Sequence, residues 1–384
     1  MVVAQLLAAR AGLAGLLIAL PLAAFAQAPR SPSPQSIEAP LRVTTIADDL
    51  EHPWGLVFLP DGRMLVTERS GRLRIVEADG RISEPLSGVP KVYARGQGGL
   101  LDVALSPAFA SDRLVYLSFA EPGKGGAGTA VVRGALTERG LVKVETIWRQ
   151  TPKTGGGNHF GSRLTFARDG TLFVTTGDRH EWPQVQDLSS TIGKVIRINS
   201  DGSIPKDNPF RSHAGAKPEI WSLGHRNAQA AALHPDTGQL WTVEHGARGG
   251  DELNHPEAGK NYGWPVITYG VDYSGRKIGE GTAKSGMEQP VYWWDPVIAP
   301  SGAMFYTGAL FPQWKGNLFV GSLNPGALVR LELGKGRVVR EERYLGELGY
   351  RVRDVAQGPD GAIYLITDHS DGKLLKIEPL RSTR

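Results

Sequence analysis

The sequence predicts an all-β fold, namely a six-bladed β-propeller whose long inter-strand loops form the active site on one face. The first observation is composition: the 384 residues contain 49 glycines and 26 prolines, which is typical of many short strands joined by turns. The second is a turn-and-strand phrase that recurs along the chain. One such unit cannot bury its own apolar face, so the copies have to stack against one another.

Each copy of the phrase pairs a tight turn, usually of Asp-Gly type, with a strand. Clear copies occupy residues 59–68, 167–176, 234–243 and 358–367, and looser ones occupy 106–117 and 312–320. Further strands are expected at 71–76 and 373–378. Six units around a ring leave only short, protected edges. An irregular β-sandwich would explain the strands but not the repetition, and the uneven spacing predicts long loops on one face.

The N-terminus resembles a secretory signal. Arg10 is the only charge before Arg30, an apolar run covers 13–22, and small residues at 24–28 suit signal peptidase. We therefore expect a signal peptide at 1–28, a flexible leader at 29–40 and one propeller domain at 41–384. An uncleaved anchor is the alternative. The expected location is periplasmic or secreted, with no membrane span after cleavage.

Composition excludes several classes of protein. The chain has no cysteine, so an exported fold must depend on a large core instead of disulfides. The formal net charge is +4 and no basic block stands out, which gives no support to a nucleic-acid partner. Residues 123–128 fit the dinucleotide pattern G-x-G-x-x-G, but 129–133 have the pattern of a strand where that motif needs a helix. We expect a hairpin loop there.

Polar residues flanked by glycine concentrate in five loops, at 95–100, 155–163, 223–227, 244–252 and 350–354. Any one of them could be a turn carrying a solvated charge. Together with the segments at 52–55, 193–199, 207–210 and 261–265, they resemble the soluble glucose dehydrogenases that use pyrroloquinoline quinone (PQQ). The similarity is closer to the aldose sugar dehydrogenase branch and runs from about 50 to 377.

The resemblance implies a six-bladed propeller that oxidises the anomeric hydroxyl of aldoses to a lactone, passing a hydride to PQQ. It implies that His159 is the general base and that Arg226 stabilises the negative charge that grows on the quinone oxygen. The implied cofactor-contacting residues are Gln97, Arg226, Asn227, Asn324, Arg351 and Arg353. The last two are two positions apart on an expected strand, so their side chains should point the same way.

Calcium is the second implied cofactor, since the ion acts as a Lewis acid on the reactive carbonyl of PQQ. The resemblance assigns the backbone carbonyls of Gly246 and Ala247 to that ion. It assigns Glu252 and the backbone oxygen of Tyr262 to a second, structural calcium ion, with Asp251 as the competing carboxylate. Hard oxygen ligands of this kind suit calcium.

Two positions depart from the glucose-specialised relatives. Asn158 stands where those relatives have an aspartate beside the catalytic histidine, and a neutral amide can orient the base but not raise its basicity. Asn324 stands where relatives have a lysine near the cofactor. The first departure weakens the expectation of strict glucose specificity, and the second raises the question of how the cofactor is held.

Two alternatives remain open at this level. A calcium-dependent lactonase would need no quinone, and it would leave Arg351 and Arg353 without a task. A non-catalytic propeller that binds sugar or protein is the other. For the dehydrogenase, the expected partners are an aldose and an unidentified periplasmic electron acceptor. The sequence leaves open the preferred sugar, the number of calcium ions and the choice between monomer and homodimer.

Overall fold

A computed structural model describes residues 35–36 and 41–380. The expected signal peptide and most of the expected leader lie outside these residues. Two leader residues form β1 (Gln35–Ser36), which pairs in parallel with β21 (Arg337–Tyr344). Among the described residues, no helix is both long and apolar enough to cross a membrane.

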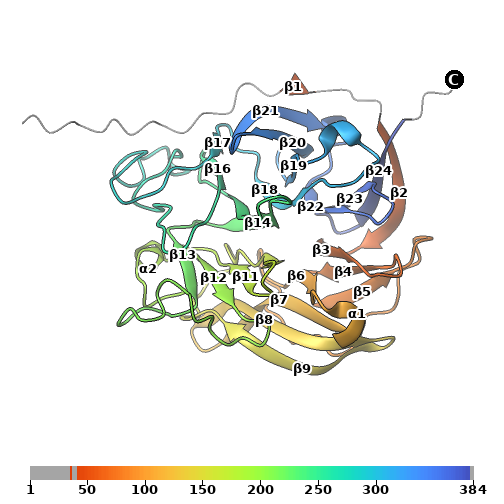
Figure 1. Cartoon of the computed structure of the whole chain (residues 1–384), viewed down its shortest axis with the longest axis horizontal. Helices are drawn as coiled ribbons and strands as arrows, with labels where there is room; N and C mark the ends of the chain where they lie inside the picture. Colours follow the sequence, from red (N-terminus) through yellow and green to blue (C-terminus); the bar gives the residue numbers. More distant parts are fainter. Residues whose placement is uncertain (1–34, 37–40, 381–384) are drawn as a thin grey trace, which may run out of the picture.

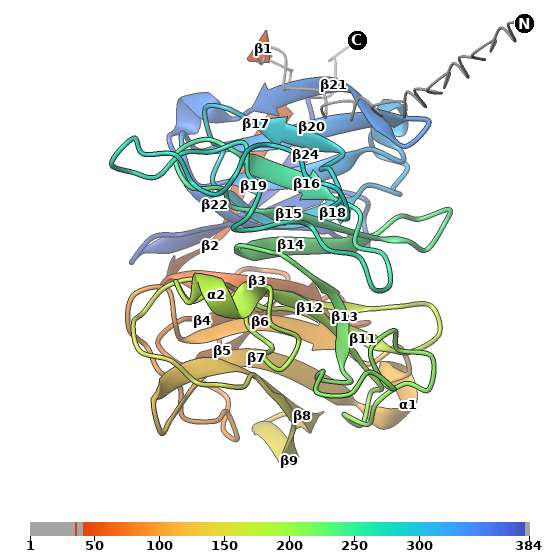
Figure 2. The ribbon, with the colours of Figure 1, turned by 90° about the vertical axis from the view of Figure 1, so that its left-hand side faces the viewer.

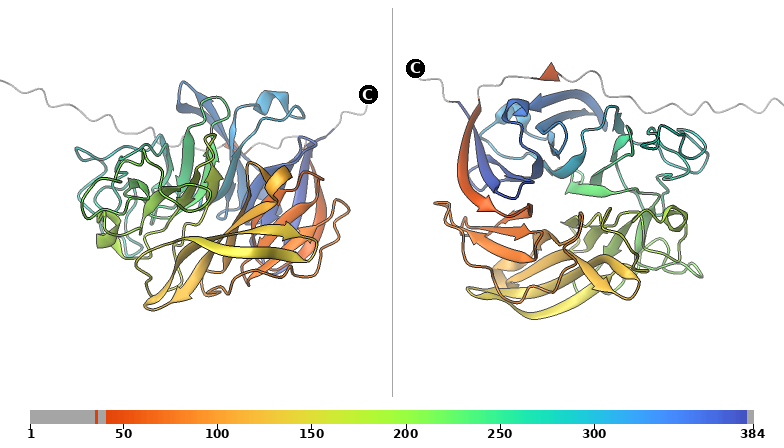
Figure 3. Two further views of the ribbon diagram at one scale, coloured as in Figure 1. Left: turned by 60° about the horizontal axis from the view of Figure 1, so that its bottom comes forward. Right: turned by 180° about the vertical axis from the view of Figure 1, so that it is seen from behind.

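Six sheets follow one another around a central axis, which confirms the predicted six-bladed propeller (Figures 1 and 3). Blade 1 contains β3 (Pro53–Phe58), β4 (Met64–Glu68) and β5 (Arg72–Val76). Blade 2 contains β6 (Leu100–Leu105), β7 (Leu114–Gly123), β8 (Gly126–Thr137) and β9 (Gly140–Arg149). Blade 3 contains β10 (Leu164–Phe166), β11 (Leu172–Thr175), β12 (Lys194–Ile198) and β13 (Ile220–Leu223). Blade 4 contains β14 (Ala228–Leu233), β15 (Leu240–Glu244), β16 (Asp251–Asn254) and β17 (Tyr292–Trp294).

Blade 5 contains β18 (Pro300–Phe305), β19 (Leu318–Ser322), β20 (Ala327–Gly334) and β21, and blade 6 contains β22 (Val352–Gln357), β23 (Ile363–Thr367), β24 (Gly372–Pro379) and β2 (Leu41–Leu50). Blade 6 closes the ring, because β2 from the start of the domain pairs with β24 from its end. Figure 2 shows the two halves of the ring from the side, β3–β13 below and β14–β24 above. The helical elements are short: α1 (Phe109–Asp112), α2 (Trp182–Val185), Pro312–Trp314 and Gly346–Leu348.

The repeated phrase has one structural meaning throughout. Its six copies supply the second strand of each blade, namely β4, β7, β11, β15, β19 and β23. The Asp-Gly turn in front of β4 shows why the phrase recurs: Gly62 has a positive φ of 88°, and Asp61 Oδ1 accepts the backbone N–H of Arg63 at 3.1 Å. The 123–128 segment is the predicted hairpin loop, since Gly123 pairs with Gly126 between β7 and β8.

The strands are buried on both faces because each blade packs between two others. Every residue of β4 and β11 is buried, which explains why these strands are nearly continuous apolar runs. Alternating strands would expose one face to water. A ring of six such sheets is therefore stabilised by apolar packing between blades, as expected for a chain without disulfides.

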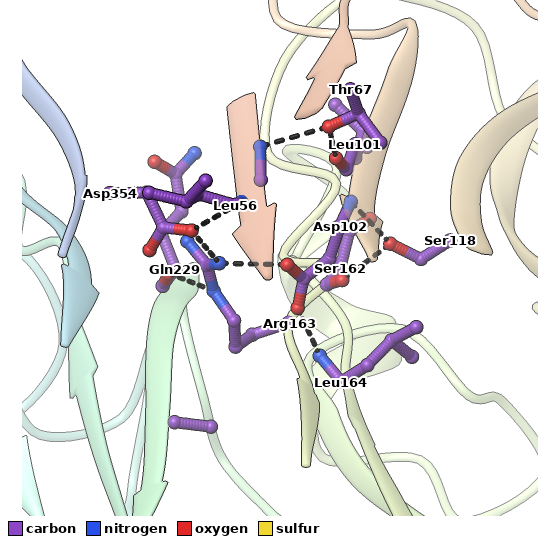
Figure 4. Close-up of polar contacts among 12 residues, drawn as sticks. Leu56, Thr67, Leu101, Asp102, Ser118, Ser162, Arg163, Leu164, Gln229 and Asp354 are labelled. Carbon is purple, nitrogen blue, oxygen red and sulfur yellow. Dashed lines mark hydrogen bonds and ion pairs between the residues drawn. The ribbon is translucent and has the colours of Figure 1, made fainter. Parts of the chain in front are cut away.

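An ion network joins the innermost strands at the axis (Figure 4). Arg163 Nη1 contacts Asp102 Oδ1 at 2.8 Å and Asp354 Oδ2 at 3.1 Å. Its Nε donates to the carbonyl oxygen of Gln229 in β14, and Asp354 Oδ2 also accepts the N–H of Leu56 in β3. Burial raises the pKa of Asp102 to about 6 despite Arg163. The network ties five of the six blades together.

Candidate active site

All the innermost strands begin at the same end of the axis, and the second strands end there. The loops at that end therefore combine residues that precede a first strand with residues that follow a second strand. Gln97, His159, Arg226 and Arg351 precede β6, β10, β14 and β22. Asp178, His245 and Asp368 follow β11, β15 and β23. This geometry brings distant segments of sequence to one face.

His159 is buried, and two polar contacts fix it. Its backbone N–H donates to Gln97 Oε1 at 2.9 Å, and its Nδ1 lies 2.7 Å from Asp178 Oδ1. The backbone φ of His159 is 56°, a conformation that non-glycine residues seldom adopt and that is common at functional sites. Gly177 is needed beneath it, since a Cβ there would lie 1.9 Å from His159 O. With Nδ1 engaged, Nε2 is the ring atom left to exchange a proton.

Asp178 is the functional residue that the sequence reasoning missed. The sequence draws attention to Asn158, the neighbour of His159, but Asn158 is exposed, and a carboxylate partner comes from the end of β11. Asp178 Oδ2 also accepts a hydrogen bond from Trp264 Nε1 at 2.8 Å. Its position directly after a repeated phrase, where second strands end at the site, is the signal that could have found it.

The electrostatics suit a neutral base. Burial lowers the pKa of His159 below its ordinary value, and the hydrogen bond to Asp178 offsets only part of this effect. Burial alone would raise the pKa of Asp178, but His159 and nearby charges outweigh it and keep that pKa below its usual range. At neutral pH the pair is therefore an uncharged imidazole beside a carboxylate, the arrangement of a general base and its orienting group.

Two further side chains border this pair. The exposed ring of His180 lies 4.2 Å from that of His159, and these two histidines and Asp178 offer ligand atoms within 4.8 Å of one another. Because His159 and Asp178 already share a hydrogen bond, we interpret the group as a proton-transfer site. Arg226 is buried, its Nη1 donates to Gly246 O, and its Nε is a buried donor without a partner.

A cavity of about 300 Å³, which we call the arginine cavity, opens next to His159. Its lining includes Trp54, Gln97, His245, Arg351, Arg353 and Asp368. Gln97 connects the cavity to His159, since its side chain lines the cavity and accepts the backbone N–H of His159. Gln97 thus joins the backbone of His159 to the cavity.

The pair Arg351 and Arg353 converges on one carboxylate. Arg351 Nη2 and Arg353 Nη2 lie 3.0 and 2.8 Å from Asp368 Oδ2. Asp354, which follows Arg353 in the sequence, contacts Arg163 at the axis instead. Arg353 Nε and His245 Nε2 are buried donors or acceptors without a partner. Unsatisfied buried groups of this kind cost free energy unless a ligand pairs with them.

Three of the expected cofactor contacts, Arg226, Asn227 and Asn324, lie outside the arginine cavity lining. Asn227 is buried, and its Oδ1 accepts the N–H of Gly161 at 3.0 Å, which anchors the loop after His159. Asn324 is exposed to solvent, whereas its neighbour Leu323 lines the cavity, and the Leu323 carbonyl accepts a hydrogen bond from Arg351 Nη1 at 3.0 Å. Asn227 therefore has a supporting position and Asn324 a peripheral one.

A second, much smaller cavity of about 10 Å³, the acidic chamber, adjoins the first through His245. Its lining includes Arg226, Glu244, Gly246, Glu252 and Tyr262. This size suits a single water molecule or ion. Burial, and then the neighbouring Glu244, raise the pKa of Glu252 well above its ordinary value. Two buried carboxylates side by side favour a bound cation.

The structure also separates Glu252 from its competitor. Asp251 Oδ1 accepts the N–H of Gly246 at 2.7 Å, and its Oδ2 accepts those of Ile298 and Ala299 at 2.8 Å. These three bonds occupy the Asp251 carboxylate. Within the described part of the chain, the Glu252 carboxylate accepts a single hydrogen bond, from Asn254 Nδ2 at 3.2 Å, so Glu252 keeps lone pairs for a metal.

A larger cavity lies at the other end of β10. It measures about 580 Å³ and is lined by the turns before β11 and β15. One of its guanidinium groups, that of Arg197, is already bonded to Asp169, Thr171 and Asp207. No residue of the His159–Asp178 pair lines it. Size alone therefore does not identify the reactive site.

Comparison with known proteins supports the assignment of the fold. The chain is 48% identical to the aldose sugar dehydrogenase YliI of Escherichia coli over 348 residues, covering 89% of this chain and 94% of that protein. The crystal structure of the soluble aldose sugar dehydrogenase of E. coli in the apo-form superposes with a TM-score of 0.87 at 47% identity, over 88% of this chain and 99% of that one.

The PQQ-bound aldose sugar dehydrogenase of Streptomyces coelicolor superposes with a TM-score of 0.72 at 31% identity, over 90% of this chain and 99% of that one. The family model described as glucose/sorbosone dehydrogenase matches residues 50–376, which include all six blades and every candidate site residue named above. The chain therefore belongs to the glucose/sorbosone dehydrogenase family.

Proposed function

We propose that this protein is an aldose sugar dehydrogenase that depends on PQQ and calcium and oxidises the anomeric hydroxyl to a lactone. The observation that carries the proposal is the His159–Asp178 pair, which Gln97 joins to the arginine cavity. A base beside a cationic, partly unsatisfied cavity suits hydride transfer to an anionic organic cofactor. The relatives named as aldose sugar dehydrogenases support the choice of substrate class.

The chain's own groups account for the proton. His159 Nε2 takes the proton of the anomeric hydroxyl while the hydride leaves the same carbon, so the C–O bond becomes the carbonyl of the lactone. Asp178 stabilises the imidazolium that forms, because its carboxylate already contacts Nδ1 at 2.7 Å. When bound, PQQ would supply the hydride acceptor and calcium would supply Lewis-acid activation of that acceptor. An external acceptor would be needed for the two electrons.

The residues fit both groups. Arg351, Arg353 and Gln97 would hold PQQ, since the guanidinium groups suit its carboxylates. Arg226 would stand beside the reacting end, because its charge acts directly on His159 and its Nε is unpaired. Gly246 and Ala247 would offer carbonyl oxygens to the catalytic calcium. Glu252 and Tyr262 would hold a second calcium ion in the acidic chamber.

We also propose export to the periplasm or beyond, from the charge and apolar pattern of residues 1–28. Within that compartment the electron acceptor would be another exported protein or small molecule.

The test is dye reduction by purified apo-protein with glucose and xylose, titrating PQQ in the presence of calcium and then with calcium chelated. Saturable activity that needs both additions is expected. His159→Ala should abolish turnover while PQQ remains bound, as followed by its absorbance after gel filtration. Near-normal turnover by that variant would show that His159 is not the base. Lactone hydrolysis that needs calcium alone would favour the lactonase.

A further inference from the structure

Arg69, directly after β4 in blade 1, is a third arginine of the arginine cavity. The second strands of three other blades, β11, β15 and β23, deliver Asp178, His245 and Asp368 to the same end of the axis. Arg69 lines the same cavity as Arg351 and Arg353. Its sequence context is a charged residue after a strand, which by itself suggests only a solvated loop.

The bonding of Arg69 leaves one edge of its guanidinium group open. Nη1 donates to the carbonyl oxygen of Gly96 at 2.8 Å, which fixes the side chain. Nε is buried and has no hydrogen-bond partner. No hydrogen bond from Nη2 is found within the described residues. The Nε–Nη2 edge is the one that binds a carboxylate through two parallel hydrogen bonds.

The charge of the cavity lining also favours an anionic ligand. The cavity lining holds three arginines and one carboxylate, Asp368. Burial lowers the pKa of Arg353, and among the charges that lower it further Arg69 acts more strongly than Arg351. Arg69 and Arg353 line the same cavity, so their like charges repel unless anions offset them. Asp368 forms ion pairs with Arg351 and Arg353, and the charge of Arg69 also lowers the pKa of Asp368, so three guanidinium groups share this one carboxylate.

We propose that Arg69 binds a carboxylate of the cofactor through its Nε–Nη2 edge, as a third anchor opposite Arg351 and Arg353. The inference rests on the proposed function. It also explains how the cavity stays strongly cationic while Asn324 faces solvent. The ligand class is an aromatic compound carrying several carboxylates, of which PQQ is the proposed member.

The alternative is a structural role, in which Arg69 only ties blade 1 to the loop of Gly96. The two roles predict opposite effects on the cofactor-free protein. A structural arginine stabilises it, so its removal lowers the melting temperature. An anchor placed beside Arg353 repels that group in the absence of ligand, so its removal leaves the melting temperature unchanged or raises it.

The test measures PQQ binding to apo-protein with calcium present, by titration calorimetry and by PQQ absorbance retained after gel filtration. Arg69→Gln should weaken binding by about 10- to 100-fold, the loss expected for charge-assisted hydrogen bonds. Arg69→Lys keeps the charge but lacks the forked guanidinium group, so its affinity for PQQ should lie between that of the unchanged chain and that of Arg69→Gln. Arg95→Gln is the matched control, because Arg95 is exposed and lies outside the cavity lining; it should bind within about twofold of the unchanged chain.

The outcomes are separable. If the unchanged chain binds PQQ and Arg69→Gln binds it equally well, the anchor role is wrong and the proposed function survives. If Arg69→Gln lowers the melting temperature of the apo-protein and binding falls only in proportion to unfolded protein, the role is structural. If the unchanged chain binds no PQQ under these conditions, the proposed function fails together with this inference.

Discussion

Replacement of Asp178 by asparagine tests the site where the structure corrected the sequence. The amide would keep the size of the side chain and its contact to Trp264, but it would remove the charge beside His159. In the reaction His159 gains a positive charge, and the carboxylate at 2.7 Å stabilises that charge inside a buried site. Removing it therefore acts on the transition state more than on the resting protein.

The magnitude follows from the contact. A buried hydrogen bond to a charged group contributes about 1.5–3 kcal/mol. Since each 1.36 kcal/mol is about tenfold in rate, kcat should fall by roughly 10- to 150-fold. PQQ affinity should change less than about twofold, because Asp178 is not part of the arginine cavity lining. The assay is dye reduction at saturating PQQ and calcium across pH, beside a binding titration.

The pH profile separates this role from simple misfolding. His159 must be neutral to act, so activity is present above its pKa and is lost as the pH falls through it. Burial places that pKa below the ordinary 6.5, and Asp178 raises it in part. In Asp178→Asn the acid limb should therefore move to lower pH while the plateau falls. Asp187→Asn, at an exposed local turn, is the control. A kcat within about threefold of the unchanged chain, with the same acid limb, would refute the reasoning.

Two further predictions concern stability. Arg163→Met leaves two buried carboxylates at the axis without their cation and should lower the free energy of unfolding in urea by about 3–5 kcal/mol. A decrease below about 1 kcal/mol would show that the network does not hold the blades together. Calcium should raise the melting temperature of the unchanged chain and, by the same amount, that of the control Glu257→Gln, which is exposed, whereas Glu252→Gln should keep only the part of the shift that comes from the catalytic calcium site. An undiminished calcium shift in Glu252→Gln would remove the acidic chamber as a metal site.

The sequence by itself determined the ring of blades. The turn in front of β4 is fixed by Asp61 and Gly62 within a few residues of the strand, and the same local chemistry returns along the chain. Blade count, the hairpin at 123–128 and the segments that carry site residues could all be predicted for this reason. His159 and the Arg351–Arg353 pair were found through their resemblance to a known family.

Contacts between segments that lie far apart in the sequence were decided only by the tertiary structure. His159 precedes the first strand of blade 3 and Asp178 follows its second strand, and the two side chains are in contact. Arg69 of blade 1 and Arg353 of blade 6 line the same cavity. Arg351 precedes β22 and Asp368 follows β23, so their pairing depends on the register of two strands. Turn chemistry acts over neighbouring residues, whereas these pairs depend on how strands align and how blades pack. That packing is why a carboxylate from the end of β11, and not the residue beside His159 in sequence, became the partner of the base.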